Sequence, residues 1–511
     1  QANAIIPDTI PEMTYPESVY NLTKIENVDS DNLPSNSIIR YELDFKSDKY
    51  VPVYYLLSLK QNEYGAKDNV DEVRDINFVV PVAENSDENA FEFNIKYNVD
   101  NTRLSGRMSS ILGNSTIDKD FIDIKSSVSQ GGAIYNSSSN VNIAGDFVNN
   151  LVESTVLEIY GGAIYNRGNI KNITSNFIDN RVNAISSSNR PWGGAIYNCG
   201  YIEKISGDFI NNYTKSNGSD ALGGAITLHK GGDIGNLYSN FIGNHAIGKT
   251  RSFGGAFFLA KDTSKSTIDD IIGDFIGNYA IANEAIGGAI YNEASLVRNI
   301  TGDFIKNFVS SNAKESKGGA IAGTGEFADI QGDFISNHAY SKNSNALGGA
   351  IFNDGGRLGS KDTLGNVIGG IINSSFYNNY AKAPNGNAQG GAIYTKGSLN
   401  IIANNAQSAF SGNYVEDKNG KRYEAIYAGS SSAEIVLSTK NNGNIYFDDS
   451  INGVSGYKLS LTGDNTGKIS LYNDVENAKV TSDNVTIDLA NNETRDYNFV
   501  SMKQMKIQNL I

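Results

Sequence analysis

Aspartates that precede a phenylalanine at regular intervals are the first residues in this sequence that could do chemistry. They are Asp146, Asp208, Asp274, Asp303 and Asp333. Stacked at the strand spacing of ~4.8 Å, such charges would repel one another and could attract a cation. Asn176 and Asn240 hold the same position in other copies, which favours an outward, solvated column set by a turn preference. We therefore expect no metal site.

Catalytic residues are equally poorly supported by the pattern. A polysaccharide lyase or glycoside hydrolase needs clustered carboxylates with a base or a metal. The nearest candidates, Asp269-Asp270 and Asp448-Asp449, adjoin no histidine, and the single Cys199 has no histidine close in sequence. We expect Cys199 to be a packed thiol, and no catalytic or cofactor-binding residue. The three histidines, two of them at a variable loop position after a recurring asparagine, are His229, His245 and His338.

Two motifs that surround these residues alternate along most of the chain. Gly-Gly-Ala recurs at a mean interval of 31 residues over its first eight copies. Its copies begin at Gly131, Gly161, Gly193, Gly223, Gly254, Gly287, Gly318, Gly348 and Gly390. Phe-x-x-Asn begins at Phe147, Phe177, Phe209, Phe241, Phe275, Phe304, Phe334, Phe376 and Phe410. A period of this length predicts a solenoid, a propeller or an array.

The content of each unit selects among these architectures. Glycine and β-branched residues are too frequent for paired helices, and a propeller blade needs about 40 residues. Three short apolar segments per unit fit one coil of a solenoid. The sequence therefore predicts an all-β, right-handed parallel β-helix of ~31-residue coils.

Strand alternation assigns a direction to the recurring residues. Ile164 and its counterparts must point inward, whereas Tyr165 and its counterparts Tyr135, Tyr197 and Tyr291 point outward, where they form an outer aromatic stripe or pack under a loop. The asparagine two residues after the isoleucine shares the inward direction, so its amides can bond from coil to coil. The predicted structural ladder comprises Asn136, Asn166, Asn198, Asn292 and Asn353, with an inner aromatic column of Phe147, Phe177, Phe209, Phe241, Phe275, Phe304 and Phe334.

Gly-Gly-Ala-Ile alternating with Phe-x-x-Asn resembles the repeats of polymorphic outer-membrane proteins, which occur in autotransporter passenger domains. The resemblance covers roughly residues 106–430. It implies a parallel β-helix exported to the surface of a Gram-negative-type bacterium and often serving adhesion. Family members end in a transmembrane β-barrel, which this chain lacks, so contact with the outer membrane is expected only through that absent barrel.

The ends of the chain differ from the repeats. Residues 1–4 contain Ala2-Asn3-Ala4, which is typical of a signal-peptidase site and predicts a signal-peptide remnant. Residues 5–105 hold six of the eight prolines and strand-like runs, and we expect a β-rich region that caps the open end of the helix. Residues 431–511 lack both motifs and are predicted to be a β-helix stem leading toward the missing barrel.

Charge and loop lengths narrow the function. A net charge of −14 disfavours nucleic acid but not host-cell, matrix or glycan ligands, and we expect a monomer. One insertion, near Asp354–Gly370, should leave the stack as a loop that serves recognition or is tolerated drift. The preferred function is a non-catalytic surface adhesin or structural passenger. The alternatives are a β-helical polysaccharide lyase or glycoside hydrolase, and a passive stalk.

Overall fold

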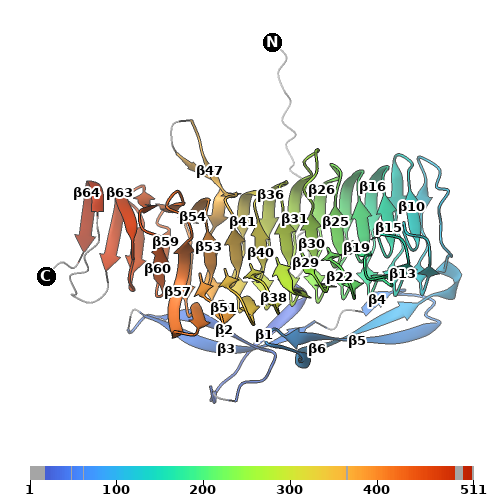
Figure 1. Cartoon of the computed structure of the whole chain (residues 1–511), viewed down its shortest axis with the longest axis horizontal. Helices are drawn as coiled ribbons and strands as arrows, with labels where there is room; N and C mark the ends of the chain where they lie inside the picture. Colours follow the sequence, from blue (N-terminus) through green and yellow to red (C-terminus); the bar gives the residue numbers. More distant parts are fainter. Residues whose placement is uncertain are drawn as a thin grey trace, which may run out of the picture.

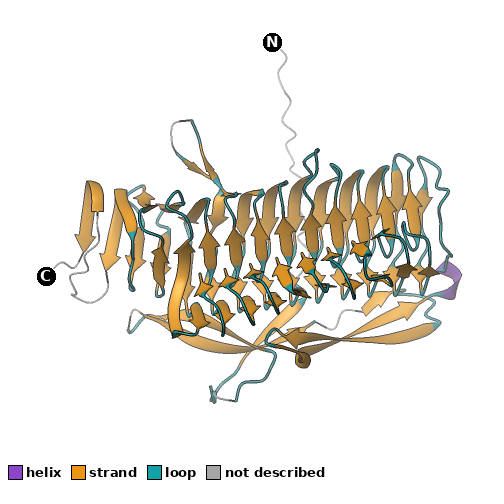
Figure 2. Cartoon of the chain, viewed as in Figure 1, coloured by secondary structure: helices purple, strands orange, loops and turns teal. Residues whose placement is uncertain are grey.

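The computed structural model describes residues 18–30, 32–47, 49–60, 63–363, 366–489 and 499–508. The signal remnant expected at residues 1–4 lies outside the described residues. Stacked coils form a rod, and nearly all regular structure is strand (Figures 1 and 2). Corresponding strands of successive coils pair in parallel, as the pairing of Ile134 with Ile164 and of Ile164 with Ile196 illustrates. The prediction of an all-β parallel β-helix is confirmed.

In the repeat region each coil begins after Gly-Gly-Ala with a three-residue strand and continues with a second, usually longer strand; the last two of the first strands are longer and do not follow this motif. The first strands are β10 (Ile134–Asn136), β15 (Ile164–Asn166), β20 (Ile196–Asn198), β25 (Ile226–Leu228), β30 (Phe257–Leu259), β35 (Ile290–Asn292), β40 (Ile321–Gly323), β45 (Ile351–Asn353), β53 (Ile393–Thr395), β57 (Gly420–Ala428) and β60 (Ser450–Gly453). The second strands are β7 (Thr116–Ile117), β11 (Val141–Ile143), β16 (Asn169–Thr174), β21 (Tyr201–Ser206), β26 (Asp233–Tyr238), β31 (Thr267–Ile272), β36 (Leu296–Thr301), β41 (Glu326–Gln331), β46 (Arg357–Leu358) with β49 (Gly370–Ile372), β54 (Ser398–Asn404), β58 (Glu434–Lys440), β61 (Tyr457–Gly463) and β63 (Ala478–Leu489).

The Phe-x-x-Asn motif supplies the third strand of the coil, and a fourth strand follows its asparagine. The third strands are β8 (Phe121–Ile122), β12 (Phe147–Val148), β17 (Phe177–Ile178), β22 (Phe209–Ile210), β27 (Phe241–Ile242), β32 (Phe275–Ile276), β37 (Phe304–Ile305), β42 (Phe334–Ile335), β50 (Phe376–Tyr377), β55 (Gln407–Ser411), β59 (Asn444–Phe447) and β62 (Lys468–Leu471). The fourth strands are β9 (Lys125–Ser126), β13 (Leu151–Ser154), β18 (Arg181–Ala184), β23 (Tyr213–Ser216), β28 (His245–Ile247), β33 (Tyr279–Ala282), β38 (Phe308–Ser311), β43 (His338–Ser341), β51 (Tyr380–Ala383) and β56 (Tyr414–Asp417).

A fifth, short strand closes eight of the coils. These strands are β14 (Glu158–Tyr160), β19 (Arg190–Trp192), β24 (Ala221–Leu222), β29 (Arg251–Phe253), β34 (Glu284–Ile286), β39 (Ser316–Lys317), β44 (Ala346–Leu347) and β52 (Ala388–Gln389). The glycine pair turns the chain from this strand into the next coil. The first glycine of each pair has a left-handed φ, as at Gly161 (+62°), and a Cβ there would lie 2.1 Å from the Ile164 carbonyl oxygen. Glycine is therefore required at this corner.

The interior of the rod is one continuous apolar cluster from Ile117 to Ile487. Isoleucines of the first strands, phenylalanines of the third strands and the alanine of Gly-Gly-Ala fill it. The predicted inner column of Ile134, Ile164, Ile196, Ile226 and Ile290 is buried, and each strand in it pairs in register with its neighbour. Beyond residue 430 both motifs are absent, yet β58, β61 and β63 continue the stack in parallel.

The N-terminal region, residues 18–105, consists of two small sheets. One contains β1 (Tyr20–Lys24), β3 (Lys49–Leu59) and β2 (Ser37–Asp44), and the other contains β4 (Glu63–Gly65), β6 (Asn85–Val99) and β5 (Glu72–Val82), followed by the 3₁₀ turn η1 (Asn101–Arg103). We expected this region to cover an open end of the helix. It lies instead along the side of the rod (Figure 1), and this placement corrects that expectation.

An apolar row on the outside of the rod explains this lateral position. The residue after each motif phenylalanine points away from the core, as Ile178, Ile210 and Ile242 do, and these side chains form one buried cluster with the N-terminal region. Alone, the row would expose a long apolar strip to water, which is costly. The N-terminal region covers it from Val148 to Tyr377, and Ala409 and Tyr446, which precede a phenylalanine, extend the same cluster.

The insertion in the coil that begins at Gly348 leaves the stack as a β-hairpin. Strand β41 pairs with β46 before the insertion and with β49 after it, so the stack continues on both sides. The hairpin itself consists of β47 (Ser360–Lys361) and β48 (Val367–Ile368), which pair antiparallel. It projects from the rod (Figure 1). The described part of the chain contains no helix long and apolar enough to cross a membrane.

Candidate functional site

The predicted asparagine ladder of the first strands is continuous over three coils only. The Asn136 amide donates to Asn166 Oδ1, and the Asn166 amide donates to Asn198 Oδ1, both over 2.8 Å. The next two coils have Leu228 and Leu259 at this position, and leucine cannot accept a hydrogen bond. The Asn198 amide therefore donates to the Asp233 carbonyl at 3.0 Å. The two later members bond elsewhere: Asn292 to the Ser295 carbonyl and Asn353 to Thr395 Oγ1.

A longer ladder is made by the asparagine of Phe-x-x-Asn, and our sequence reasoning missed it. From the sequence we gave this asparagine no structural role, but Asn180 is fully buried. The ladder runs without interruption through Asn150, Asn180, Asn212, Asn244, Asn278, Asn307, Asn337, Asn379 and Asn413 and ends at Asp449. The signal was present in the sequence, because this asparagine never varies among the nine copies.

Every asparagine of this Phe-x-x-Asn ladder after Asn150 uses its whole amide. The Asn278 Nδ2 group donates to the Phe241 carbonyl and to Asn307 Oδ1, each at 2.9 Å. Its Oδ1 accepts from the backbone N–H and the Nδ2 group of Asn244, each at 3.0 Å. Both donors and both acceptor sites of the amide are therefore satisfied in a buried position.

Asp449 ends this ladder for a chemical reason. A carboxylate accepts hydrogen bonds but cannot pass one on. Its oxygens accept from the backbone N–H of Gly412 and from the backbone N–H and Nδ2 of Asn413, at 2.8–3.1 Å. Burial raises the pKa of Asp449 well above its ordinary value, although these bonds oppose the shift. Its neighbour Asp448 accepts a hydrogen bond from Ser411 Oγ at 2.9 Å.

The phenylalanines of the motif stack as a second inner column. Successive rings from Phe121 to Phe447 lie 4.2–5.0 Å apart and within 8° of parallel. The column includes all seven phenylalanines that we singled out. Offset parallel stacking of this kind adds to the energy of apolar burial.

The aspartate column lies beneath the N-terminal region, so the expectation of an outward, solvated column is wrong. One oxygen of each carboxylate accepts from the backbone N–H of the next coil, as Asp303 Oδ1 does from Asp333 at 2.7 Å. The other oxygen bonds to the N-terminal region in four of the five cases. These contacts are Tyr97 to Asp146 (3.3 Å), Tyr64 to Asp208 (2.9 Å), Tyr20 to Asp303 (2.8 Å) and Arg40 to Asp333 (2.7 Å).

Burial raises the pKa of four of the covered carboxylates. Burial raises the pKa of Asp146 and of Asp274 to about 6, and the nearby charge of Asp303 adds to the shift at Asp274. Burial also raises the pKa of Asp208 and Asp333. A raised carboxyl pKa in a cleft often marks a catalytic acid. Here the buried aspartates serve a structural purpose, because their oxygens accept hydrogen bonds from the N-terminal region and from the backbone of the next coil.

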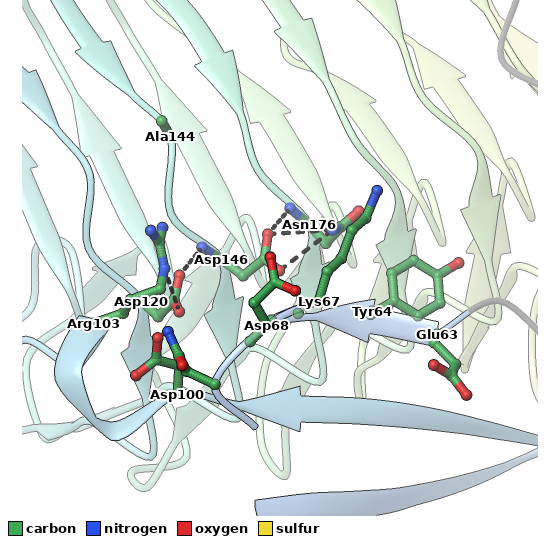
Figure 3. Close-up of a pocket in the computed structure, with 13 residues that line it drawn as sticks. Glu63, Tyr64, Lys67, Asp68, Asp100, Arg103, Asp120, Ala144, Asp146 and Asn176 are labelled. Carbon is green, nitrogen blue, oxygen red and sulfur yellow. Dashed lines mark hydrogen bonds and ion pairs between the residues drawn. The ribbon is translucent and has the colours of Figure 1, made fainter. Parts of the chain in front are cut away.

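A cavity of about 870 Å³ opens where the N-terminal region meets the first coils. Lys67 and Asp68, which follow β4, line it; Asp68 points toward Asp146, and Lys67 extends alongside Asn176 (Figure 3). On its far side Arg103 donates to Asp120 Oδ2 at 3.1 Å. Among the described residues, no group of three or more His, Cys, Asp or Glu is arranged to hold a metal ion.

The outer aromatic stripe is more buried than strand alternation suggested. Tyr135, Tyr165 and Tyr197 stack at 5.2–5.3 Å, but Tyr197 is only 1% exposed. Side chains from the fifth strands cover it, Tyr160 and Trp192 among them. The stripe thus belongs to a small hydrophobic cluster outside the rod, beside the Gly-Gly turn. Tyr135, Tyr165 and Tyr291 are half-buried and remain partly accessible to solvent.

His229 is the one histidine with partners that resemble a catalytic relay. Its Nδ1 lies 2.8 Å from the Tyr197 hydroxyl, and its Nε2 lies 3.6 Å from Asp262 Oδ2. Its ring also stacks on Trp192. Burial lowers its pKa. The hydroxyl that it contacts is enclosed, so the group packs the corner and offers no nucleophile to solvent.

The other two histidines and the cysteine also have packing roles. His245 and His338 do not lie in loops; they stack with tyrosine or phenylalanine rings at 4.6–5.2 Å on the fourth strands. Burial lowers the pKa of His245 to about 4. Cys199 Sγ lies 3.7 Å from the Tyr165 hydroxyl and 3.4 Å from the Asn166 carbonyl oxygen.

The remaining acidic pair, Asp269-Asp270, bonds to exposed neighbours in the next coil. Asp269 pairs with Arg298 at 2.9 Å, and Asp270 accepts from Asn299 at 2.7 Å. Both pairs lie on the outer face of the second strands. Neither aspartate adjoins a histidine in the structure, as in the sequence.

Comparison with known families identifies the repeat. Residues 373–396 match the family described as Chlamydia polymorphic membrane protein repeat. The matched segment contains Phe376 and Asn379 of one motif and Gly390-Gly391-Ala392-Ile393 of the other. The coils on both sides repeat the same strands and the same ladders. This chain therefore carries repeats of the polymorphic outer-membrane-protein type. No curated protein and no solved structure matches it.

Proposed function

We propose that this chain is the exported passenger portion of an autotransporter-type protein on the surface of a Gram-negative-type bacterium. The observation that supports this most strongly is the repeat itself: stacked Gly-Gly-Ala and Phe-x-x-Asn coils with a match at residues 373–396. A rod of parallel coils needs no disulfide, and the sequence has a single cysteine. Such a rod extends a long surface away from its attachment point.

We further propose that the passenger acts by adhesion and not by catalysis. The recurring polar residues are engaged in stacking or in holding the N-terminal region, and the recurring aspartates before the motif phenylalanines lie beneath that region. What differs between coils is the hairpin at Ser360–Ile368, whose two strands project from an otherwise regular surface. Projections on a rigid scaffold are common recognition elements.

Binding of the labelled, purified chain to cultured epithelial cells tests this function. We expect saturable binding that unlabelled chain competes for, and no such binding by an unrelated protein of similar negative charge. The same preparation should release no reducing sugar from neutral or acidic polysaccharides. Absence of saturable binding would overturn the adhesive role, and release of sugar would overturn the non-catalytic one.

A further inference from the structure

A polar groove of about 760 Å³ lies between the hairpin β47–β48 and the outer face of the second strands β58, β61 and β63. One wall is the hairpin, which contributes Lys361, Asn366 and Val367. The floor is the sheet, and its hydroxyl side chains line the groove. They are Ser438, Ser460, Thr462 and Thr481.

The floor is regular because the strands beneath it pair in parallel. Ser438 is in register with Thr462, and Ser460 is in register with Thr481. Neighbouring hydroxyls are only loosely bonded, at 3.4 Å for Thr462 to Ser438 and 3.2 Å for Thr481 to Ser460. Ser460, Thr462 and Thr481 are half-buried. Each hydroxyl therefore keeps hydrogen-bonding capacity toward a ligand.

The hairpin wall is fixed to the sheet. The Asn400 amide on β54 donates to the Ser360 carbonyl at 2.9 Å and to the Gly369 carbonyl at 3.2 Å, which are the two ends of the insertion. Lys440 Nζ donates to the Val367 carbonyl at 3.4 Å. A ligand would thus meet a wall and floor already in place, which lowers the entropic cost of binding.

Charge indicates what such a groove accepts. Two lysines, Lys361 and Lys440, and two aspartates, Asp464 and Asp483, line it, so the lining is neutral although the chain carries −14. Few apolar side chains are available to hold a peptide, and the strands beneath the groove already pair on both sides. Rows of hydroxyls spaced at ~4.8 Å suit a ligand with repeating hydroxyl groups.

We propose that this groove binds a neutral oligosaccharide, which lies across β58, β61 and β63 against the hairpin. The inference rests on the proposed adhesive function and gives it a ligand class. Ser460 and Thr481 bond the sugar hydroxyls from below, and Asn366 and Lys361 bond them from the side.

Calorimetric titration of the full chain with cellohexaose, maltohexaose and N-acetylchitohexaose tests the proposal. We expect at least one of these to bind. The double variant Ser460→Ala/Thr481→Val removes two hydrogen-bonding groups, and loss of ~0.7 kcal/mol at each lowers the affinity about tenfold. Thr486→Val is the matched control, because Thr486 lies on β63 as Thr481 does, is also half-buried and is outside the groove. The affinity of this variant for the oligosaccharide should equal that of the wild type.

A second variant separates binding from folding. Removal of residues 360–368 joins β46 to β49 through two glycines, and the coil should close as its sister coils do, with unchanged circular dichroism. We expect oligosaccharide binding to be lost. Heparin is titrated as an acidic comparison. The inference would be overturned if heparin bound and the three neutral oligosaccharides did not, or if no probe bound at millimolar concentration. It would also be overturned if neither groove variant changed the binding. If the chain binds cells but no oligosaccharide, the proposed oligosaccharide groove is wrong and the proposed adhesive function is retained. If it binds neither cells nor oligosaccharides, both proposals are wrong.

Discussion

The two asparagine columns of this β-helix begin alike and end differently. The column of the first strands holds asparagine in three successive coils, and in the later coils leucine, glycine or threonine interrupts it between Asn292 and Asn353 or beside them. The Phe-x-x-Asn ladder holds asparagine in every coil from Asn150 to Asn413. Both columns are buried, so burial alone does not decide where asparagine is required.

The backbone at each column explains the difference. The residue before each ladder asparagine turns into the left-handed region, with φ of 56° at Asn149, 52° at Asn211 and 53° at Lys306. At this turn the backbone leaves the hydrogen-bonding pattern of the parallel sheet. The asparagine N–H and the phenylalanine carbonyl would otherwise be unpaired, and they bond to asparagine side chains instead. In the first strands the backbone bonds already run from coil to coil, so a leucine such as Leu228 can replace the asparagine.

Replacement of Asn278 by Leu should have the largest effect on stability. It removes four buried hydrogen bonds, which join the Asn278 side chain to the Asn244 N–H, the Asn244 Nδ2 group, the Phe241 carbonyl and Asn307 Oδ1. At ~1 kcal/mol or more for each lost bond, the local free energy of unfolding should fall by about 5 kcal/mol. Native-state hydrogen exchange of the coils around residue 278 measures this, and a loss below ~1 kcal/mol would contradict the ladder's role.

Replacement of Phe209 by Ala should come next. The ring lies between Phe177 and Phe241, at 4.6 and 5.0 Å, and is fully buried. The cavity should cost ~3–5 kcal/mol in the same measurement. Phe209→Leu is the control, because it keeps most of the apolar volume and should cost clearly less. Equal losses for the two variants would argue against a packed column.

Replacement of Asn198 by Leu sharpens the comparison between the columns. Asn198 receives the Asn166 amide at 2.8 Å, and its own amide bonds to the Asp233 carbonyl. Since Leu228 occupies the next coil in register, we expect a loss of only ~1–2 kcal/mol. A loss as large as that of Asn278→Leu would remove the distinction drawn above.

Acidification should stabilise the protein slightly. The folded-state pKa is raised to about 6 at Asp146 and Asp274 and to about 7 at Glu424. The folded state therefore binds more protons than the unfolded state between pH ~4 and these values, and the gain is lost as pH rises through them. Protonation of His245 in the unfolded state opposes this below pH ~6.5, but more carboxyl groups than histidines are shifted.

We thus expect the melting temperature to rise by a few degrees from pH 7.5 to pH 5. Asp208→Asn with Asp274→Asn should flatten this dependence and be tolerated, because Asn176 and Asn240 hold the same position in neighbouring coils. A melting temperature that falls steadily over this range in the wild type would contradict the raised pKa values.

Sequence periodicity was sufficient to predict the stacked coils, but it did not predict the position of the N-terminal region that covers one side of them. The spacing of Gly-Gly-Ala and Phe-x-x-Asn predicts the parallel stack and the inner isoleucine and phenylalanine columns, because both depend on local alternation. The position of the N-terminal region depends on contacts such as Tyr20 with Asp303, which are 283 residues apart. The ladder at Asn180 was missed because a polar residue after a short strand is more often a solvated turn.

The most direct test of this account is residue-resolved hydrogen exchange at the ladder asparagines. The backbone N–H groups of Asn180, Asn212, Asn244 and Asn307 lie next to left-handed turns, where exchange is ordinarily fast, yet each donates to the buried Oδ1 of the next coil. The account predicts exchange as slow as that of Ile164 and Ile196 in the first strands. Exchange at the rate of the exposed turn residues, with the strands still protected, would contradict it.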